Sequence, residues 1–444
     1  MKILFLEIDT EQTWALASVG PAFIASYIRK HGHDASLLRV QPDCEFQDII
    51  RGIEKESPDI LSFSLTTRQW IRAASLAGEI RRNLDIPIIA GGLHPTFAPL
   101  SVLESGVFDY VCLGEGEEAV CEMLTHLEKG EDIRAAGIPN IWVKGLGRPE
   151  IRPPVSVDHL PFMARDLLDE THGVVHISTM RGCPFPCTYC AGGAIGRLYN
   201  DREYIRRRSV DDVLGELRHI RKNAPINYVI FLDDTFTVNR GWVEEFCTAY
   251  GREIGTDFSI NARAETVSPD MITMLAQAGC KHIIYGVESG SRRVREDILK
   301  RPGDNRQFID TFRWTKEAGM LATANYMIGI PGETSEDIEQ TLALNDELAP
   351  DDFGYFVFYP YPGTFLFEIC RERGYLPENY QALPANNRRS ILKLPDLTGD
   401  EIEDYYTVFT DAREKNYLKR YGSAYNEAHK AIAIKSFRDS ADTG

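Results

Sequence analysis

Three cysteines lie close together in the segment Met180–Cys190, which reads Met-Arg-Gly-Cys-Pro-Phe-Pro-Cys-Thr-Tyr-Cys. They are Cys183, Cys187 and Cys190, and the two prolines between the first pair prevent a helix there. Thiolates at this density indicate a loop that wraps an iron–sulfur cluster, and three ligands on a four-iron (4Fe-4S) cluster leave one iron open for chemistry. The alternative is structural zinc, which favours paired cysteines and needs a fourth ligand that is not evident nearby.

The spacing Cys-x3-Cys-x2-Cys, with an aromatic residue before the last cysteine, resembles the signature of the radical SAM enzymes. The resemblance implies that the open iron chelates the amino and carboxylate groups of S-adenosylmethionine (SAM). It also implies that Tyr189 flanks the adenine of SAM.

The elements that must position this loop form a βα series from residue 174 onward. Strands are expected at 174–179, 228–232, 258–261, 282–287, 323–328 and 353–359, with helices at 210–222, 242–254, 269–278, 305–318 and 335–348. Six strands with five crossovers predict an open, partial (β/α)6 barrel, whose site lies at the carboxyl ends of the strands.

Other strand ends fit the radical SAM pattern in order. The resemblance implies that the carboxylates after the second strand accept from the SAM amino group, that the fourth strand end meets the ribose and carboxylate, and that the fifth packs near adenine. We also consider the third strand end, at Arg263, as a contact for SAM or for substrate. Helix capping is the alternative role for Asp233 and Glu288. The implied SAM-binding set is Tyr189, Asp233, Asp234, Arg263, Glu288, Ser289 and Ile330.

The first 130 or so residues also alternate strand and helix. Strands are expected at 3–6, 35–38, 60–64, 87–90 and 110–113, and helices at 21–31, 47–55, 70–84 and 117–128. Single helices between strands require parallel crossovers, so the pattern predicts a five-stranded, Rossmann-like (flavodoxin-like) α/β sheet. Ligands of such sheets bind beyond the carboxyl ends of the strands.

The segments 18–28, 91–96 and 111–117 resemble the cobalamin-binding half of cobalamin-dependent radical SAM enzymes. With this half, the resemblance covers about residues 2–360. Paired glycines at a strand end let backbone approach a ligand closely. The implied cobalamin-binding residues are Thr13, Gly20, Thr66, Arg68, Gln69, Gly91, Gly92, His94, Thr96, Gly114, Glu115 and Gly116.

One departure concerns the cobalt ligand. Many corrinoid proteins carry Asp-x-His-x-x-Gly after the first strand, and here residues 7–14 contain no histidine. Either cobalamin binds without a histidine ligand or the domain has lost it. For His94 we favour a turn bonded to backbone over a cobalt ligand, and Arg68, Gln69 and Trp70 are alternatives that line the lower corrin face.

The expected domains are a cobalamin-binding domain at 1–136, a linker at 137–170 with a small hairpin near 140–152, the barrel at 171–360 and a helical region at 361–444. Within the last region, 402–419 is the clearest amphipathic helix. Aromatic residues alternate along the last barrel strand. Most belong to the core, but Tyr359 and Tyr361, at its exit, are candidates for lining the substrate cavity.

Composition excludes several classes. A net charge of −17 opposes broad nucleic-acid binding, and no apolar run approaches the ~20 residues that span a membrane. The start does not resemble a signal peptide, and the six scattered cysteines suit a reduced, cytoplasmic protein. The basic run 202–208 is either a solvated face or a contact for an anionic substrate or an acidic electron donor.

The resemblance implies a cobalamin-dependent radical SAM enzyme acting on a small molecule and reduced by a protein such as flavodoxin or ferredoxin. We expect a methyltransferase that moves a methyl group from methylcobalamin to a substrate carbon radical, itself made by the 5′-deoxyadenosyl radical. Such transfer favours a pocket between the two domains. A cyclase or ring-rearranging enzyme is the alternative. A non-catalytic corrinoid or iron–sulfur carrier is a third possibility, disfavoured by the full set of SAM-type strand ends. A tRNA methylthiotransferase lacks support, because no extra amino-terminal cysteine trio is present.

Overall fold

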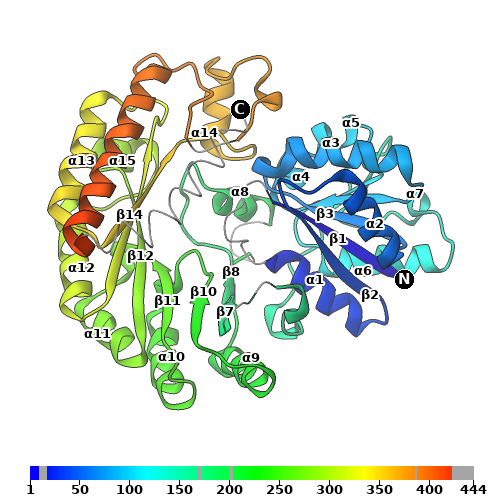
Figure 1. The fold of residues 1–444 in the computed structure, drawn as a ribbon, viewed down its shortest axis with the longest axis horizontal. Coiled ribbons are helices and arrows are strands. Elements are labelled where there is room, and N and C mark those ends of the chain that lie inside the picture. Colours follow the sequence, from blue (N-terminus) through cyan, green and yellow to red (C-terminus); the bar gives the residue numbers. More distant parts are fainter. Residues whose placement is uncertain (10–17, 169, 171–172, 200–203, 386–387, 423–444) are drawn as a thin grey trace. The chain divides into compact units, whose positions relative to one another are not determined.

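The structure is a computed structural model that describes residues 1–9, 18–168, 170, 173–199, 204–385 and 388–422 (Figure 1). The chain forms two compact units. The first contains Met1–Asp169 together with Arg197–Tyr204, and the second contains Glu170–Gly196 and the described chain from Ile205 onward.

The first unit is built on a sheet of six strands in the order β2-β1-β3-β4-β5-β6. The strands are β1 (Lys2–Ile8), β2 (Asp34–Val40), β3 (Ile60–Ser64), β4 (Ile88–Gly91), β5 (Tyr110–Cys112) and β6 (Ile141–Val143). The first five are parallel, as the alternation of strand and helix predicts, and β6 adds an antiparallel edge to β5. The expected sheet of five strands therefore gains a sixth.

Helices cover both faces of this sheet (Figure 1). They are α1 (Val19–Lys30), α2 (Phe46–Glu56), α3 (Thr67–Asn83), α4 (Leu93–Phe97), α5 (Pro99–Glu104), α6 (Glu117–Glu128) and α7 (Ile133–Ala136). Side chains of β1 alternate between the two cores: Leu4 and Leu6 pack with α2 and α3, whereas Ile3 and Phe5 pack with α1 and α6. This is the period-2 burial of a strand covered on both sides.

The segment expected as a linker is folded onto the first unit. Its one strand, β6, pairs with β5, and Met163 and Leu168 pack against Ala22 and Phe23 of α1. The expected hairpin is wrong in detail. The returning chain makes a backbone hydrogen bond from Asn140 to Glu150 (2.8 Å) but forms no second strand.

The second unit is built on a six-stranded, all-parallel sheet in the order β14-β13-β12-β11-β10-β7. The strands are β7 (Val174–Ile177), β10 (Tyr228–Phe231), β11 (Phe258–Ala262), β12 (Cys280–Glu288), β13 (Leu321–Ile328) and β14 (Asp352–Val357). A separate two-stranded ribbon joins β8 (Met180–Arg181) to β9 (Arg206–Arg207). The six expected barrel strands are all present and consecutive, and the sheet is open because β7 and β14 do not pair with each other.

The crossover helices lie along the outer side of the curved sheet, and α8 lies on its inner side (Figure 1). They are α9 (Val210–Asn223), α10 (Arg240–Glu253), α11 (Pro269–Ala278), α12 (Asn305–Glu317) and α13 (Ser335–Leu348), and α8 spans Ala191–Leu198. Outward-facing strand residues such as Phe258, Ile283 and Tyr326 form one large core with these helices. The inner side is left for the loops that follow the strands.

In the described chain after β14, the α-helices are α14 (Phe365–Glu372) and α15 (Gly399–Tyr421). The expected helix at 402–419 lies within α15, which begins three residues earlier because Thr398 and Glu401 form a capping box. Phe409 of α15 packs on Phe353 and Tyr355 of β14. Within the described ranges, no helix combines the length and apolarity needed to cross a bilayer.

Candidate active site

The cysteine loop begins where β7 ends, and Asp233 fixes that point. Its carboxylate accepts hydrogen bonds from the backbone amides of Thr179 (2.8 Å) and Met180 (3.0 Å) and from the Thr179 hydroxyl. Asp233 is only 3% exposed, so these contacts occupy its oxygens inside the protein. The structure therefore gives Asp233 a positioning role at the start of the loop, in place of the expected SAM contact.

The far end of the loop is held through Thr188. Its amide and hydroxyl donate to the carbonyls of Leu299 (3.1 Å) and Ile298 (2.7 Å), and its own carbonyl accepts from the amide of Leu366 (3.0 Å). The next residue, Tyr189, packs against the apolar cluster that contains Ile330. The two residues expected to flank adenine thus share one cluster.

The three thiols are free, and the neighbouring thiolates are close enough to raise the pKa of Cys183 and that of Cys190. Burial raises the pKa of the Cys190 thiol to about 12 and that of Cys183 above its ordinary value. A Cβ on Gly192 would lie 3.6 Å from both Cys183 Cβ and Cys190 Sγ, so the first turn of α8 passes in van der Waals reach of these two cysteines. The loop therefore brings the three cysteines together around a glycine-lined space.

These residues fit a cluster better than a single ion. In the described part of the chain, no three His, Cys, Asp or Glu side chains are placed to share one metal ion, and this holds for the three cysteines. A four-iron cluster is larger and takes thiolates on several of its irons. Asp234, exposed and without a hydrogen bond to any described residue, lies beside the same space, 3.9 Å from a Cβ built on Gly192.

Two buried arginines face Cys187. Nη1 of Arg263 donates to Cys187 Sγ at 3.1 Å, and its Cζ lies 3.8 Å from the ring centroid of Phe185. Nη1 of Arg301 lies 4.0 Å from the same sulfur. Sequence reasoning named Arg263 as a SAM or substrate contact and missed Arg301, which follows the short π-helical segment Val294–Ile298 and has no motif to mark it.

Glu288 ends β12 in the left-handed region, at φ +69°, where the register with β13 shifts. Its carboxylate is 3.9 Å from Arg301, whose Nη2 also donates to the carbonyl of Gly286 at 2.5 Å. Burial is the largest single influence and lowers the pKa of Arg301, but Glu288, Tyr189, Cys187 and Glu265 together hold that pKa above its ordinary value. Glu288 therefore remains a residue of the site, although an arginine already neutralises it.

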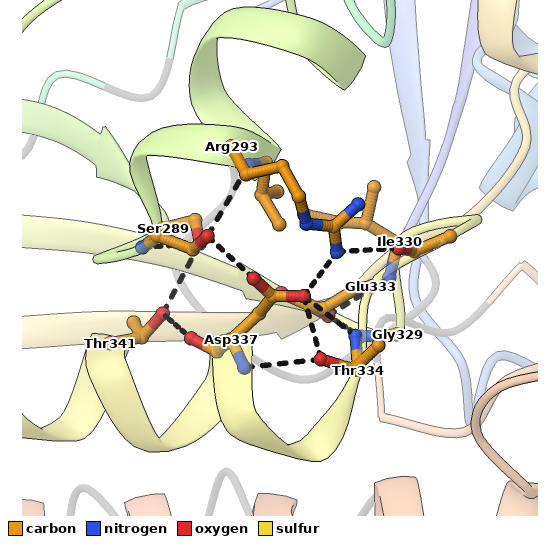
Figure 2. Close-up of polar contacts among 11 residues, drawn as sticks. Ser289, Arg293, Gly329, Ile330, Glu333, Thr334, Asp337 and Thr341 are labelled. Carbon is orange, nitrogen blue, oxygen red and sulfur yellow. Dashed lines mark hydrogen bonds and ion pairs between the residues drawn. The ribbon is translucent and has the colours of Figure 1, made fainter.

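Ser289, expected as a SAM contact, is instead part of the sheet-to-helix packing shown in Figure 2. It is fully buried, its hydroxyl lies 3.3 Å from that of Thr341 in α13, and it accepts from the amide of Ser291 (3.2 Å). The Thr341 hydroxyl also accepts from the amide of Gly290 (2.8 Å). We therefore withdraw Ser289 from the expected SAM set.

The same network reaches the loop after β13 (Figure 2). One oxygen of the buried Glu333 carboxylate accepts from the amides of Gly329 (2.7 Å) and Ile330 (3.1 Å), and the other has no hydrogen-bond partner among the described residues. Burial raises the pKa of Glu333 to about 8. The neutral carboxyl holds the turn that presents Ile330.

The other residues of the second unit that the sequence singled out are two tyrosines after β14 and the arginines of the basic run. Tyr359 is buried, and its ring lies 5.1 Å from that of the partly buried Tyr361. In the basic run, Arg207 lies over Trp242 (4.4 Å) and Arg208 pairs with Glu216 (2.6 Å). These two arginines are buried or half-buried, so neither the solvated face nor an open anion contact describes them.

In the first unit, a cavity of about 270 Å³ lies at the carboxyl end of the sheet, where β1, β3 and the start of α1 meet. It is lined by Phe5, Leu6, Glu7, Ser18, Val19, Gly20, Pro21, Ser64 and Gln69. Two expected cobalamin residues, Gly20 and Gln69, therefore line a real cavity. Thr13 lies outside the described residues.

Residues at the start of α3 serve mainly to hold the loop. Gln69 forms a capping box with the exposed Thr66 and donates to the carbonyl of Ile8 (2.9 Å), which ties α3 to β1. Arg68 is partly buried beside them. Trp70 is buried and stacks on His94 (4.8 Å), so it belongs to the core and not to a corrin face.

His94 lies in the short helix α4, not in the expected turn. Its Nδ1 is 3.3 Å from the Thr67 hydroxyl, and its Nε2 is 3.5 Å from the Ser101 hydroxyl. Burial lowers the pKa of His94 to about 4, so the ring is neutral near pH 7. Side-chain hydroxyls, and not the expected backbone groups, engage this ring.

The paired glycines after β4 make room for protein. Gly92 has φ +94°, and a Cβ there would lie 2.7 Å from the backbone nitrogen of Leu65. A Cβ on Gly91 would touch Cys112. The Thr96 hydroxyl donates to the Gly92 carbonyl (2.7 Å) and accepts from the amide of Gly114 (2.9 Å). We expected a corrin ring to approach the backbone at these glycines. In the structure, the loop that contains Leu65 takes that place.

The space beside the glycines after β5 is likewise occupied by side chains of the protein. The hydroxyl of Tyr199 would lie 2.0 Å from a Cβ on Gly114, and it accepts a hydrogen bond from the amide of Glu115 (2.6 Å). A Cβ on Gly116 would lie 2.9 Å from Ile24. Tyr199, unmarked in the sequence, therefore explains the first glycine of this motif.

Comparisons with known proteins agree with this arrangement. The Radical SAM superfamily matches residues 177–344, and the B12 binding domain matches residues 16–124. The chain is 31% identical, over 90% of its length and 90% of the relative's, to the "Uncharacterized methyltransferase PH0819" of Pyrococcus horikoshii. It is 24% identical, over 83% of its length and 70% of the relative's, to the anaerobic magnesium-protoporphyrin IX monomethyl ester cyclase of Rubrivivax gelatinosus.

Among solved structures, the fold is similar to that of the cobalamin-dependent S-adenosylmethionine radical enzyme OxsB with aqua-cobalamin and S-adenosylmethionine bound. The TM-score is 0.73 at 16% identity, with 99% of this chain and 75% of that chain covered. The cysteine spacing, the two units and these matches lead to one conclusion. The chain belongs to the family of cobalamin-dependent radical SAM enzymes.

Proposed function

We propose that this enzyme is a methyltransferase that acts on a carbon atom of a small molecule. The observation that carries the proposal is the pairing in one chain of a fixed three-cysteine loop with a B12 binding domain. The likeness to a protein named as a methyltransferase, at 31% identity over nearly the whole length of both chains, favours methylation. When bound, the cofactors supply an adenosyl radical from SAM and a methyl group from cobalamin.

In this proposal Cys183, Cys187 and Cys190 hold the cluster, and neighbouring groups bind SAM. Asp234 is the free carboxylate at the end of β10 and keeps the role that the sequence implied for both Asp233 and Asp234, as acceptor for the SAM amino group. Tyr189, backed by the fully buried Ile330 in the same apolar cluster, contacts adenine, and Glu288 receives the ribose. Tyr359 and Tyr361 remain candidates for the substrate wall.

The first unit holds cobalamin through the cavity at Gly20 and Gln69. We assign no nitrogen ligand from the protein to cobalt. His94, which the sequence already disfavoured as a cobalt ligand, is buried against Trp70 with hydroxyls at both ring nitrogens. Arg68 is the cationic side chain of the α3 turn and stays a candidate for the lower corrin face.

Reduction needs an electron donor of low potential, for which a flavodoxin or ferredoxin is suitable. The proposal includes such a protein as the partner. Purified flavodoxin or ferredoxin, together with its reductase, should therefore support the turnover assay described below when it replaces the chemical reductant dithionite.

A second function has a specific observation in its favour. One relative is named as a cyclase, so ring formation with the same cofactors is the alternative. The two differ in products. Methylation consumes two SAM molecules and releases both 5′-deoxyadenosine and S-adenosylhomocysteine, whereas cyclisation releases 5′-deoxyadenosine alone.

The test is anaerobic turnover of reconstituted enzyme with candidate substrates and quantification of both products. Equal amounts of the two products, with methylated substrate, support methyl transfer. 5′-Deoxyadenosine without S-adenosylhomocysteine would favour the cyclase. Omission of cobalamin is the control: it should stop S-adenosylhomocysteine formation and leave the cleavage of SAM intact.

A further inference from the structure

The three cysteines of the loop differ in the charges around them. Cys187 is the most buried of the three, at 7% exposure, and two arginines approach its sulfur. Cys183 and Cys190 instead lie beside the carboxylate of Asp234. The charged groups that create this asymmetry come from the segments that follow β10, β11 and β12.

Arg263, after β11, makes the closer contact. It is 3% exposed, and its Nη1 donates to Cys187 Sγ at 3.1 Å. Phe185 covers the flat face of the guanidinium at 3.8 Å, and Nε donates to Glu265 at 2.6 Å. The stacking and the ion pair fix the side chain, so the bond to sulfur is imposed by the surrounding structure.

Arg301, after β12, approaches from another side. It is 5% exposed, and its Nη1 lies 4.0 Å from Cys187 Sγ. Nη2 donates to the carbonyl of Gly286, and Glu288 lies 3.9 Å away. Its Nε has no partner among the described residues, so this buried cation has donor capacity to spare.

The other two sulfurs have weaker partners. Cys190 Sγ accepts from the amide of Gly192 at 3.4 Å, and Cys183 Sγ lies 3.9 Å from the Thr235 hydroxyl. Neither contact carries a positive charge. Hydrogen bonds to cluster sulfurs and nearby charge set the reduction potential of an iron–sulfur cluster, and charged donors are the stronger ones.

We propose that Arg263 and Arg301 are positioning residues that raise the reduction potential of the cluster by donating to, and lying beside, the Cys187 sulfur. The step they assist is the transfer of one electron from an external donor, a flavodoxin, a ferredoxin or dithionite, to the cluster. No bond breaks in that step. The added negative charge falls where two guanidinium groups are already fixed, so no reorganisation is needed to stabilise it.

Glu265 limits how far Arg263 raises the reduction potential of the cluster. It withdraws part of the Arg263 charge through their ion pair, and its side chain keeps 21% exposure. Removing this carboxylate leaves the Arg263–Cys187 contact with a fuller positive charge. Substitutions at Arg263 and at Glu265 should therefore move the potential in opposite directions.

This inference rests on the proposed cluster ligands, and the test separates the two. Wild type, Arg263→Gln, Glu265→Gln and Arg240→Gln are reconstituted anaerobically, and iron and sulfide are counted. The cluster is then titrated with dithionite in the absence of SAM, followed by electron paramagnetic resonance. Arg240→Gln is the matched control, because this substitution also removes one positive charge, from an exposed ion pair with Glu244.

The expected result is a more negative midpoint for Arg263→Gln by at least a tenfold change in the reduction equilibrium, about 59 mV for one electron. Glu265→Gln should shift the midpoint to more positive values, and Arg240→Gln should not shift it. If Arg263→Gln fails to retain four irons, Glu265→Gln carries the test alone. A Glu265→Gln midpoint equal to or below that of wild type overturns the inference. Failure of the wild type to hold four irons overturns the ligand assignment instead.

Discussion

The loops at the carboxyl ends of the two sheets use polar residues in different ways. In the second unit, the cysteine loop is fixed at both ends by buried bonds through Asp233 and Thr188, while the thiols and Asp234 remain available. In the first unit, most residues of the recognisable motifs already contact protein. Gly92 accommodates Leu65, and Gly114 accommodates Tyr199.

The difference teaches that a motif can mark a fold without marking ligand contacts. The contacts that the cysteine sulfurs make, such as that of Cys187 with Arg263, do not explain the spacing of the cysteines, so the spacing reports chemistry directly. The glycines of the first unit are required instead by the tight packing of neighbouring loops. The cavity that we propose for cobalamin lies between β1, β3 and α1, and its lining residues are chemically ordinary.

The largest expected effect concerns the cysteines. The triple variant Cys183→Ala, Cys187→Ala and Cys190→Ala should hold no four-iron cluster, because all the proposed thiolate ligands are lost. Iron and sulfide analysis after anaerobic reconstitution measures this. Cys44→Ala, at an exposed cysteine outside the loop, is the control and should retain full iron. Full iron in the triple variant would remove the basis of the assignment.

A second variant tests whether the glycines of the first unit are structural. Gly92→Ala should destabilise the protein by roughly 3 kcal/mol or more, since it adds left-handed strain and a collision with the Leu65 backbone. Gly130→Ala separates the cost of left-handed backbone strain from the cost of the collision. Its φ is +70° but its Cβ would meet nothing, so about 1–2 kcal/mol is expected. Denaturant unfolding compares them, and equal losses would contradict the packing explanation.

A third prediction uses the pH dependence of stability. Glu333 has a pKa of about 8 in the folded protein against an ordinary 4.5, so it keeps its proton when folded but loses it when unfolded. Its contribution is complete below pH 4.5 and is lost as the pH rises toward 8, by roughly 1.4 kcal/mol per pH unit.

Glu333→Gln should remove that contribution to the slope while keeping the acceptor for Gly329 and Ile330. Free energies of unfolding at pH 6 and pH 8 measure the slope for wild type and variant. Identical slopes would show that Glu333 is ionised in the folded protein.

The smallest effect tests the revised role of Ser289. Ser289→Ala should cost about 1 kcal/mol of stability through the lost contact with Thr341 and leave the affinity for SAM unchanged. Asp234→Asn, at the free carboxylate, should weaken SAM binding and leave stability nearly unchanged. Calorimetric SAM titration of both variants sharpens the contrast between residues that build the site and residues that bind. A large loss of SAM affinity in Ser289→Ala would restore the original assignment.

Much of the fold could be predicted from the sequence, because strand and helix periods are local. All eleven parallel strands of the two sheets lie where the apolar runs place them. The short helices α4 and α5 were missed, since each is too short for a period to show. The strand near residue 141 was expected in a local hairpin, and its antiparallel pairing with β5 was missed. The cysteines were identifiable because nothing else explains their spacing.

The rest of the site depends on contacts between distant segments. Asp233 and Asp234 are neighbours in the chain, yet one is buried under Thr179 and the other is exposed. No local pattern distinguishes them. Arg301 and Tyr199 carry no motif, and their importance follows only from the groups they meet in the folded protein.

The central claim is that three cysteines of one loop leave an iron open for SAM. Electron paramagnetic resonance of the reduced cluster, recorded before and after adding SAM to the anaerobic wild-type enzyme, tests it most directly. We predict that SAM changes the signal, and that SAM labelled with ¹⁵N at its amino group gives a nitrogen coupling to the cluster in the pulsed experiment. An unchanged signal without such coupling, from protein that holds four irons, would contradict the account.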